Sequence, residues 1–173
     1  IDQTGGSLTA AGLEFDSAAA VTLDEAGNDA DTVAGTSNGT ITLVDTDDLK
    51  VDTVGTHTGL ISTDNLIDIT AGGLLELAAN LNAGTGNAKL VTTAGAIDQT
   101  GGALTAAGLE FDSAAAVTLD EAGNDVDTVA GTSNGTITLV DTDDLKVDTV
   151  GTHTGLISTD NLIDVTAGGL LEL

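Results

Sequence analysis

Residues 39–77 read GTITLVDTDDLKVDTVGTHTGLISTDNLIDITAGGLLEL, and residues 135–173 repeat them with one change, Val165 in place of Ile69. Within this stretch, short runs such as LKV and LEL place a polar residue between two apolar ones. Such alternation is typical of β-strands that bury one face. Gly, Asn and Asp separate the runs, and these residues favour turns. The stretch therefore predicts short strands joined by tight turns.

The repetition extends over the whole chain. Residues 97–173 match residues 1–77 at all but three positions, which are Ser7/Ala103, Ala30/Val126 and Ile69/Val165. A fixed period of 96 residues indicates an array, in which each unit buries apolar surface against its neighbours. We therefore expect a first repeat unit at residues 1–96 and an incomplete second unit at residues 97–173, cut from a longer array and forming one continuous solenoid.

The residue types favour an all-β parallel solenoid over the alternatives. Val, Ile, Thr and Gly are abundant, while Pro, Cys, Trp, Tyr, Met and Arg are absent. With about 20 residues per rung and about 4.8 Å between rungs, each repeat would form about five rungs and about 24 Å of axis. A string of small β-sandwiches is the alternative, because short strands and polar turns also suit that fold. The mutual resemblance of the sub-units favours the solenoid. In the run LEF, the only aromatic residues, Phe15 and Phe111, would then point inward as packing residues.

The charge balance limits the partners of the chain. It carries 28 acidic residues, three Lys and no Arg, for a net charge of −25. Nucleic-acid binding and docking on anionic lipid need clustered cations, so both are excluded. No apolar run approaches the length of about 18 residues that a membrane-spanning helix needs. Disorder is not expected either, because mean hydropathy is +0.22 and the apolar residues alternate regularly.

Three sub-units carry a resemblance to a known family. They are GTITLVDTDDLKVDTVG at residue 39, TGLISTDNLIDITAGG at residue 58 and KLVTTAGAIDQTGGALTAAG at residue 89. Their style resembles the repeats of filamentous-haemagglutinin-type, two-partner-secreted bacterial surface adhesins. The resemblance implies long right-handed parallel β-helices that are exported through a partner pore and serve adhesion or aggregation. It implies no catalytic or ligand residues, because that family's repeats share none.

These observations predict a structural function without catalysis. We expect an extracellular stalk or fibre segment at a bacterial cell surface, with further copies of the repeat, neighbouring fibres or cell-surface glycans as partners. One alternative is a carbohydrate-active β-helix enzyme, although lyases on this fold typically use an Arg or Lys base and this chain has no Arg. Another is a self-assembling fibre subunit that pairs through open solenoid ends.

Acidic turns are the only candidates for a ligand site. Ca²⁺ takes six to eight oxygen ligands, which oxygen-rich turns repeated along an axis can supply. The spacing matches neither D-x-[DN]-x-[DN]-G nor G-G-x-G-x-D, so solvated turns are the simpler interpretation and weak calcium binding is the alternative. No other cofactor is expected. The calcium candidates are Asp24, Glu25, Asp29, Asp31, Asp45, Asp47, Asp48, Asp120, Glu121, Asp125, Asp127, Asp141, Asp143 and Asp144.

The two histidines are expected to be ordinary turn residues. His57 and His153 each stand in the sequence THTG, with Asp52 and Asp64 close to His57 along the chain. A nucleophilic Ser or Thr would need a base within hydrogen-bond reach. Nothing in the sequence places Ser37 or Ser62 beside a histidine, so no catalytic residue is predicted.

Overall fold

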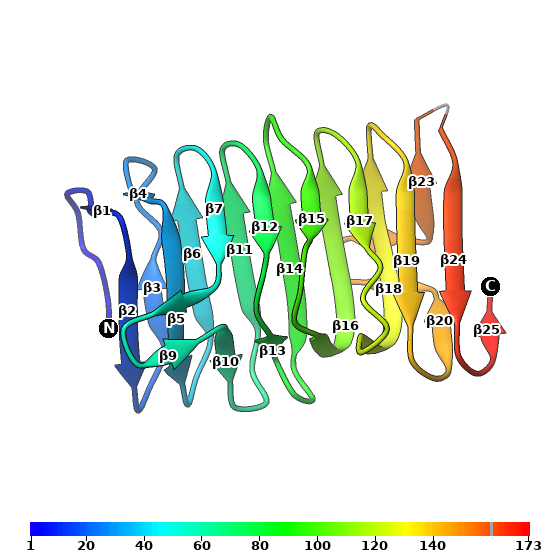
Figure 1. Ribbon diagram of the computed structural model, residues 1–173, viewed down its shortest axis with the longest axis horizontal. Coiled ribbons are helices and arrows are strands. Elements are labelled where there is room, and N and C mark those ends of the chain that lie inside the picture. Colours follow the sequence, from blue (N-terminus) through cyan, green and yellow to red (C-terminus); the bar gives the residue numbers. More distant parts are fainter. Residues whose placement is uncertain (160) are drawn as a thin grey trace.

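The chain forms a flattened solenoid with two walls (Figure 1). A computed structural model describes residues 1–159 and 161–173, and within these ranges the regular structure is entirely β. The two chain ends lie at opposite ends of the long axis. The strands of one wall run against those of the other, because the chain crosses the two walls in turn (Figure 1). The same ranges contain no helix that could span a membrane.

Parallel ladders define both walls. Wall 1 contains β3 (Val21–Leu23), β6 (Ile41–Asp45), β11 (Ile67–Ala71), β14 (Asn87–Thr92), the second halves of β16 (Leu104–Ser113) and β18 (Asp125–Ser133), β20 (Leu145–Val147), β23 (Leu156–Ser158) and β25 (Leu171–Glu172). Wall 2 contains β2 (Leu13–Ser17), β5 (Thr32–Ser37), β7 (Leu49–Val51), β10 (Leu60–Ser62), β12 (Leu75–Leu77), β13 (Leu81–Asn82), β15 (Ile97–Gln99), the first halves of β16 and β18, β17 (Val117–Leu119), β19 (Ile137–Asp141) and β24 (Ile163–Ala167).

Among the described residues, three small pairs lie outside the two walls. The short strands β1 (Thr9–Ala10) and β4 (Asp29–Ala30) pair in parallel. Two antiparallel hairpins complete the structure, one formed by β8 (Thr53–Val54) and β9 (His57–Thr58), the other by β21 (Thr149–Val150) and β22 (His153–Thr154). The hairpins occupy equivalent positions in the two repeat units.

The register of wall 1 gives the length of each coil. Val21 pairs with Ile41, Ile41 with Ile67, Ile67 with Ala88, and Ala88 with Leu109. Paired residues along this ladder are therefore 20, 26, 21 and 21 residues apart in the sequence. The predicted parallel β-solenoid is confirmed. The sandwich alternative is wrong, because the wall strands pair in parallel with the coil before and the coil after them.

The repeat does not correspond to a whole number of coils. Val117 is the copy of Val21, yet it lies in wall 2, where it pairs with Ile97 and Ile137. Four coils lead from Val21 to Leu109, and half a coil more leads to Val117. Each repeat thus makes four and a half coils, close to the expected five, or about 22 Å of axis at about 4.8 Å per coil. Equivalent residues, such as Leu49 and Leu145, consequently lie on opposite walls.

The core is a thin layer filled from both walls. Inward positions carry Leu, Ile and Val, and most are fully buried. Phe15 and Phe111 are 6% and 0% exposed, which confirms the inward orientation predicted for both. Each ring lies over a glycine of the next coil. A Cβ added to Gly131 would lie 2.5 Å from a ring carbon of Phe111, so only glycine leaves room for the ring.

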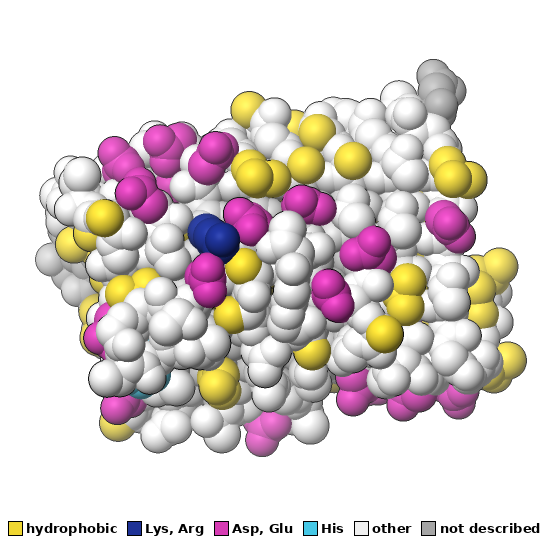
Figure 2. All heavy atoms as spheres, in the orientation of Figure 1, with side chains coloured by type: hydrophobic (Ala, Val, Ile, Leu, Met, Phe, Trp, Pro, Cys, Tyr) yellow, Lys and Arg dark blue, Asp and Glu magenta, His cyan; other side chains and the backbone are white. Residues whose placement is uncertain are grey.

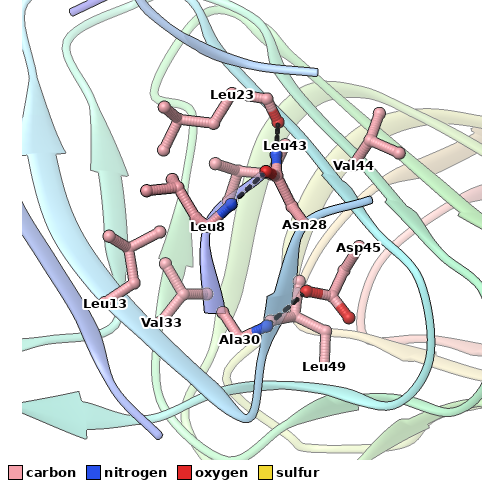
Figure 3. A pocket seen from close by; sticks show the side chains of 10 residues that line it. All are labelled: Leu8, Leu13, Leu23, Asn28, Ala30, Val33, Leu43, Val44, Asp45 and Leu49. Carbon is pink, nitrogen blue, oxygen red and sulfur yellow. Dashed lines mark hydrogen bonds between the residues drawn. The ribbon is translucent and has the colours of Figure 1, made fainter. Parts of the chain in front are cut away.

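Two of the three differing pairs, Ile69/Val165 and Ala30/Val126, lie against the core. Ile69 points into the core and is fully buried. Ala30 and Val126 are also buried, and the backbone N–H of each donates to the carboxylate of an aspartate fifteen residues later. Ala30 lines a small, mostly apolar cavity between the walls, with room for about one water molecule (Figure 3).

Candidate functional sites

The fourteen predicted calcium residues divide into inward and outward positions. Asp24 and Glu25 lie in the turn after β3, and Asp47 and Asp48 lie in the turn after β6. Both aspartates of the second turn are exposed. Asp29 lies in β4, and Asp125 and Asp127 lie in β18. The other outward candidates lie in turns, and acidic side chains gather on the face shown in Figure 2. The prediction that these turns are solvated describes this outward set.

Asp45 and its copy Asp141 are inward residues, which the sequence analysis missed. Each stands at the last inward position of its strand and is at most 5% exposed. Asp45 Oδ2 accepts a hydrogen bond from Ala30 N at 2.7 Å (Figure 3). Asp47 N donates to Asp45 Oδ1 at 3.2 Å. Burial raises the pKa of Asp45 and of Asp141, although these backbone N–H groups favour the charged form. Both carboxylates therefore accept hydrogen bonds from backbone N–H groups and stabilise the turn.

An amide pair accompanies each aspartate, partly buried in the first unit and buried in the second. Asn28 and Gln3 exchange two side-chain hydrogen bonds of 2.8 Å, and Asn124 and Gln99 form the same pair in the second unit. Asn28 also accepts from Leu8 N and donates to the carbonyl of Leu23 (Figure 3). Within the described residues, every buried side-chain polar atom has a hydrogen-bond partner. These polar groups hold adjacent coils in register.

The carboxylates do not converge on a point. Among residues 1–159 and 161–173, no group of three His, Cys, Asp or Glu side chains is arranged to hold a metal ion. Weak calcium binding at the acidic turns stays a prediction, and it would rest on diffuse attraction to many carboxylates rather than on a preformed cage.

Each repeat carries one shallow groove beside a lysine. Lys50 lies between Asp52 and Glu76, with its ammonium 3.3 Å from each carboxylate. A hydrogen bond to Asp52, followed by contacts with Glu76, raises the pKa of Lys50. Asp31 and Asp48 complete the rim of the groove. The corresponding groove of the second unit is lined by Asp127, Asp144, Leu145, Lys146, Leu170 and Glu172.

His57 makes a contact that its sequence neighbours do not predict. Its Nδ1 lies 2.7 Å from Oε1 of Glu14, which precedes it by 43 residues, instead of beside Asp52 or Asp64. The same oxygen accepts hydrogen bonds from Thr56 N and Thr56 Oγ1, at 2.7 and 2.8 Å. Because a carboxylate only accepts, Nδ1 is the ring nitrogen that carries the proton. We name Glu14, Thr56 and His57 the hairpin–Glu cluster.

The second unit repeats the cluster on the other wall. Glu110 Oε1 lies 2.8 Å from His153 Nδ1 and accepts from Thr152 N and Oγ1, both at 2.7 Å. Hydrogen bonds from His57 first, and then from Thr56, lower the pKa of Glu14 to about 2. Burial alone would raise the pKa of Glu110, but hydrogen bonds from His153 and Thr152 outweigh it and lower the pKa.

The geometry of the cluster differs from that of a catalytic triad. In a triad, the carboxylate and the nucleophile occupy different nitrogens of the imidazole, which then removes the hydroxyl proton. Here Thr56 Oγ1 donates to Glu14 directly, and it lies on the same Nδ1 side of His57 as the carboxylate. Glu14 thus organises the hairpin, and the arrangement does not activate Thr56 as a nucleophile.

Comparison with known proteins places the chain in a family without an assigned function. No curated protein and no solved structure matches it. A family described as repeats of unknown function (DUF5649) matches residues 1–37 and 36–133, which is more than half of the 173-residue chain. Both copies of Glu14 and most of the solenoid fall within the matched residues. The chain therefore belongs to the DUF5649 family of repeats of unknown function.

Proposed function

We propose that this chain is a segment of an extracellular stalk or fibre at a bacterial cell surface, of the filamentous-haemagglutinin type, and that it acts without catalysis. One observation carries the proposal. The features with chemical character, the hairpin–Glu cluster and the lysine groove, each recur once per repeat and on opposite walls. A repeated surface suits spacing and multivalent contact, whereas an enzyme needs one convergent site.

The mechanism of a stalk is geometric. Each repeat adds four and a half coils, or about 22 Å, to a continuous parallel ladder. A binding tip carried at its end would move outward by that length for each copy. The net charge of −25 would keep neighbouring rods apart at low ionic strength, and salt would screen this repulsion within about 10 Å at about 0.1 M.

The repeated outward face of the solenoid indicates which partners this segment would contact. Further copies of the repeat extend the ladder, and neighbouring fibres or cell-surface glycans would meet the outward polar side chains of the walls. Export through a partner pore and a place on the cell surface rest on the resemblance of the repeats, together with the solenoid fold.

The enzyme alternative has less support. Glycoside hydrolysis needs two carboxylates that flank one bond at a defined separation. Most outward acids here follow the turns along the axis, and Glu14 is committed to four contacts with the hairpin. Nothing in the described residues favours a substrate position beside them.

The test uses arrays of two, four and eight repeats, placed between a cell-surface anchor and a binding tip of known specificity. The reach of the tip should grow by about 22 Å per repeat, and adhesion through the tip should persist at every length. Purified arrays should release no sugar ends from polysaccharides. Reach that does not grow with copy number, or cleavage of a polysaccharide, would overturn the proposal. A matched array with the tip deleted shows whether the repeats themselves adhere.

A further inference from the structure

One coil in each repeat is longer than its neighbours. The coil from Ile41 to Ile67 has the longest separation between adjacent coils, 26 residues along the chain. The separation is 20 in the coil before it and 21 in the coil after it. The additional residues form the β8–β9 hairpin, which separates β7 from β10 on wall 2. This hairpin is an insertion into an otherwise regular strand.

The hairpin is closed on itself and stands outside the ladder. Thr53 and Thr58 pair in antiparallel fashion, and their hydroxyl oxygens are 3.0 Å apart. At its base, Gly59 N donates to the carbonyl of Asp52 at 2.8 Å. Within residues 1–159 and 161–173, the hairpin strands pair with neither adjacent coil, so continuing the wall does not require them.

The hairpin passes over the preceding coil and reaches the coil before that one. β10 pairs with β5, and β5 pairs with β2, which carries Glu14. The hairpin reaches Glu14 by passing over β5, and Figure 1 shows β9 in front of the wall at this point. Ala34 of β5 stands at an outward position between two inward residues, yet it is fully buried. The hairpin therefore covers the middle of three consecutive coils and is fixed to the first.

The anchor is built closely around one carboxylate oxygen. Oε1 of Glu14 receives contacts from the backbone and the side chain of both Thr56 and His57, between 2.7 and 3.1 Å. Gly55 turns the hairpin at a φ of 58°, and a Cβ there would lie 2.2 Å from Glu14 Oε2. Glycine is thus required both by the left-handed conformation and by the approach of the carboxylate.

We propose that each hairpin is a strap that locks three consecutive coils into one unit of unfolding. A solenoid without straps loses coils one at a time, because each coil contacts only its neighbours. A strap connects the first coil to the third, so the first cannot peel away while the anchor holds. The locked units run from residue 13 to residue 62 and from residue 109 to residue 158. The coils between them carry no strap among the described residues.

Single-molecule force spectroscopy on the 173-residue chain, held by its two ends, tests the proposal. A locked unit should open in a single step of about 170 Å at full extension, at about 3.4 Å per residue. In the double variant Glu14→Gln and Glu110→Gln, the steps should shorten to about 70 Å, the extended length of one regular coil.

A second variant keeps the test valid if the glutamine substitutions disturb folding. Deleting residues 53–58 and 149–154 removes both hairpins and gives the long coil the same length as the coil from Val21 to Ile41. This variant should also unfold in steps of about 70 Å, one coil at a time. Glu76→Gln removes a carboxylate of the same wall outside the strap and should leave the long steps unchanged. Single-coil steps in the unaltered chain, or long steps that survive deletion of both hairpins, would overturn the proposal.

Discussion

The natural difference between Ala30 and Val126 offers a matched pair of core mutations. Both positions are buried and both backbones make the same hydrogen bond, so the two repeats differ there by two methyl groups. Ala30 lines the cavity of Figure 3, which the two methyl groups of a valine would enter. We predict that Val126→Ala destabilises the chain and that Ala30→Val stabilises it.

The magnitudes follow from burial. Val126 is 1% exposed, and removing two methyl groups costs about 1.6 kcal/mol at about 0.8 kcal/mol each. The space left behind adds about 1 kcal/mol, at about 24 cal/mol per Å³ for roughly 40 Å³ that the walls cannot close. Val126→Ala should therefore cost about 2–3 kcal/mol in total. Ala30→Val should gain about 1 kcal/mol, because part of the transfer energy is offset by an imperfect fit.

Urea unfolding followed by far-UV circular dichroism measures both effects against the unaltered chain. Solenoids need not unfold in two states, so hydrogen exchange at the amides of residues 30 and 126 provides a local reading of each change. A Val126→Ala cost below about 0.5 kcal/mol would contradict the inward orientation of this position. Loss of stability in Ala30→Val would show that the cavity cannot accept the added methyl groups.

Four further results are expected. Gly131→Ala should destabilise the chain by about 1–3 kcal/mol in thermal melts, because its Cβ would overlap the ring of Phe111; unchanged melting would refute this packing. The carboxyl carbon of Glu14 should titrate by NMR with a midpoint of about 2. The ionised carboxylate then contributes fully to folding stability above the unfolded pKa of about 4.3, and this contribution is lost as the pH falls through about 2. A midpoint near 4.3 would exclude the hydrogen bonds between Glu14 and the hairpin. Asp45 should titrate above the ordinary range of an aspartate, because burial raises its pKa. Folding stability should then fall as the pH rises from the unfolded pKa of about 3.9 to the raised pKa of the folded state. An ordinary midpoint in the same NMR titration would argue against the inward position of Asp45. The melting temperature should rise with NaCl concentration, because salt screens the repulsion among the 28 acidic side chains. If the acidic turns bind calcium, millimolar CaCl₂ should raise the melting temperature by more than its ionic strength alone does, and EGTA should reverse this additional rise. A melting temperature that changes with neither salt would show that charge repulsion does not limit the stability of the rod.

The fold was predictable because alternation directly determines which side chains point inward. Runs such as LKV and IDI place their apolar residues inward in the structure, as the sequence predicts. The same pattern cannot tell one wall from the other, since both present an identical inward and outward alternation. Hence the sequence does not predict the half coil in each repeat, which strand pairings such as that of Val117 with Ile97 and Ile137 reveal.

The sites were less predictable, for two physical reasons. Asp45 follows a strand and begins an acidic turn, so composition suggested a solvated residue, whereas the strand simply continues its inward alternation by one more position. The partner of His57 is Glu14, and a contact across two coils depends on how far the inserted hairpin folds back. The unequal length of the 41–67 coil was the only signal of that insertion, and coil lengths are known only once the ladder is known.

Helical image analysis of an array of ten or more repeats, by cryo-electron microscopy, would show whether successive repeats are offset by half a coil. Each repeat should advance by about 22 Å and rotate by about 180°, with coils about 4.8 Å apart and hairpins alternating between the two walls. An advance of about 24 Å without rotation, which whole coils would give, would place all hairpins on one wall and contradict the ladder described above. Separate globular units along a thread would contradict the solenoid itself.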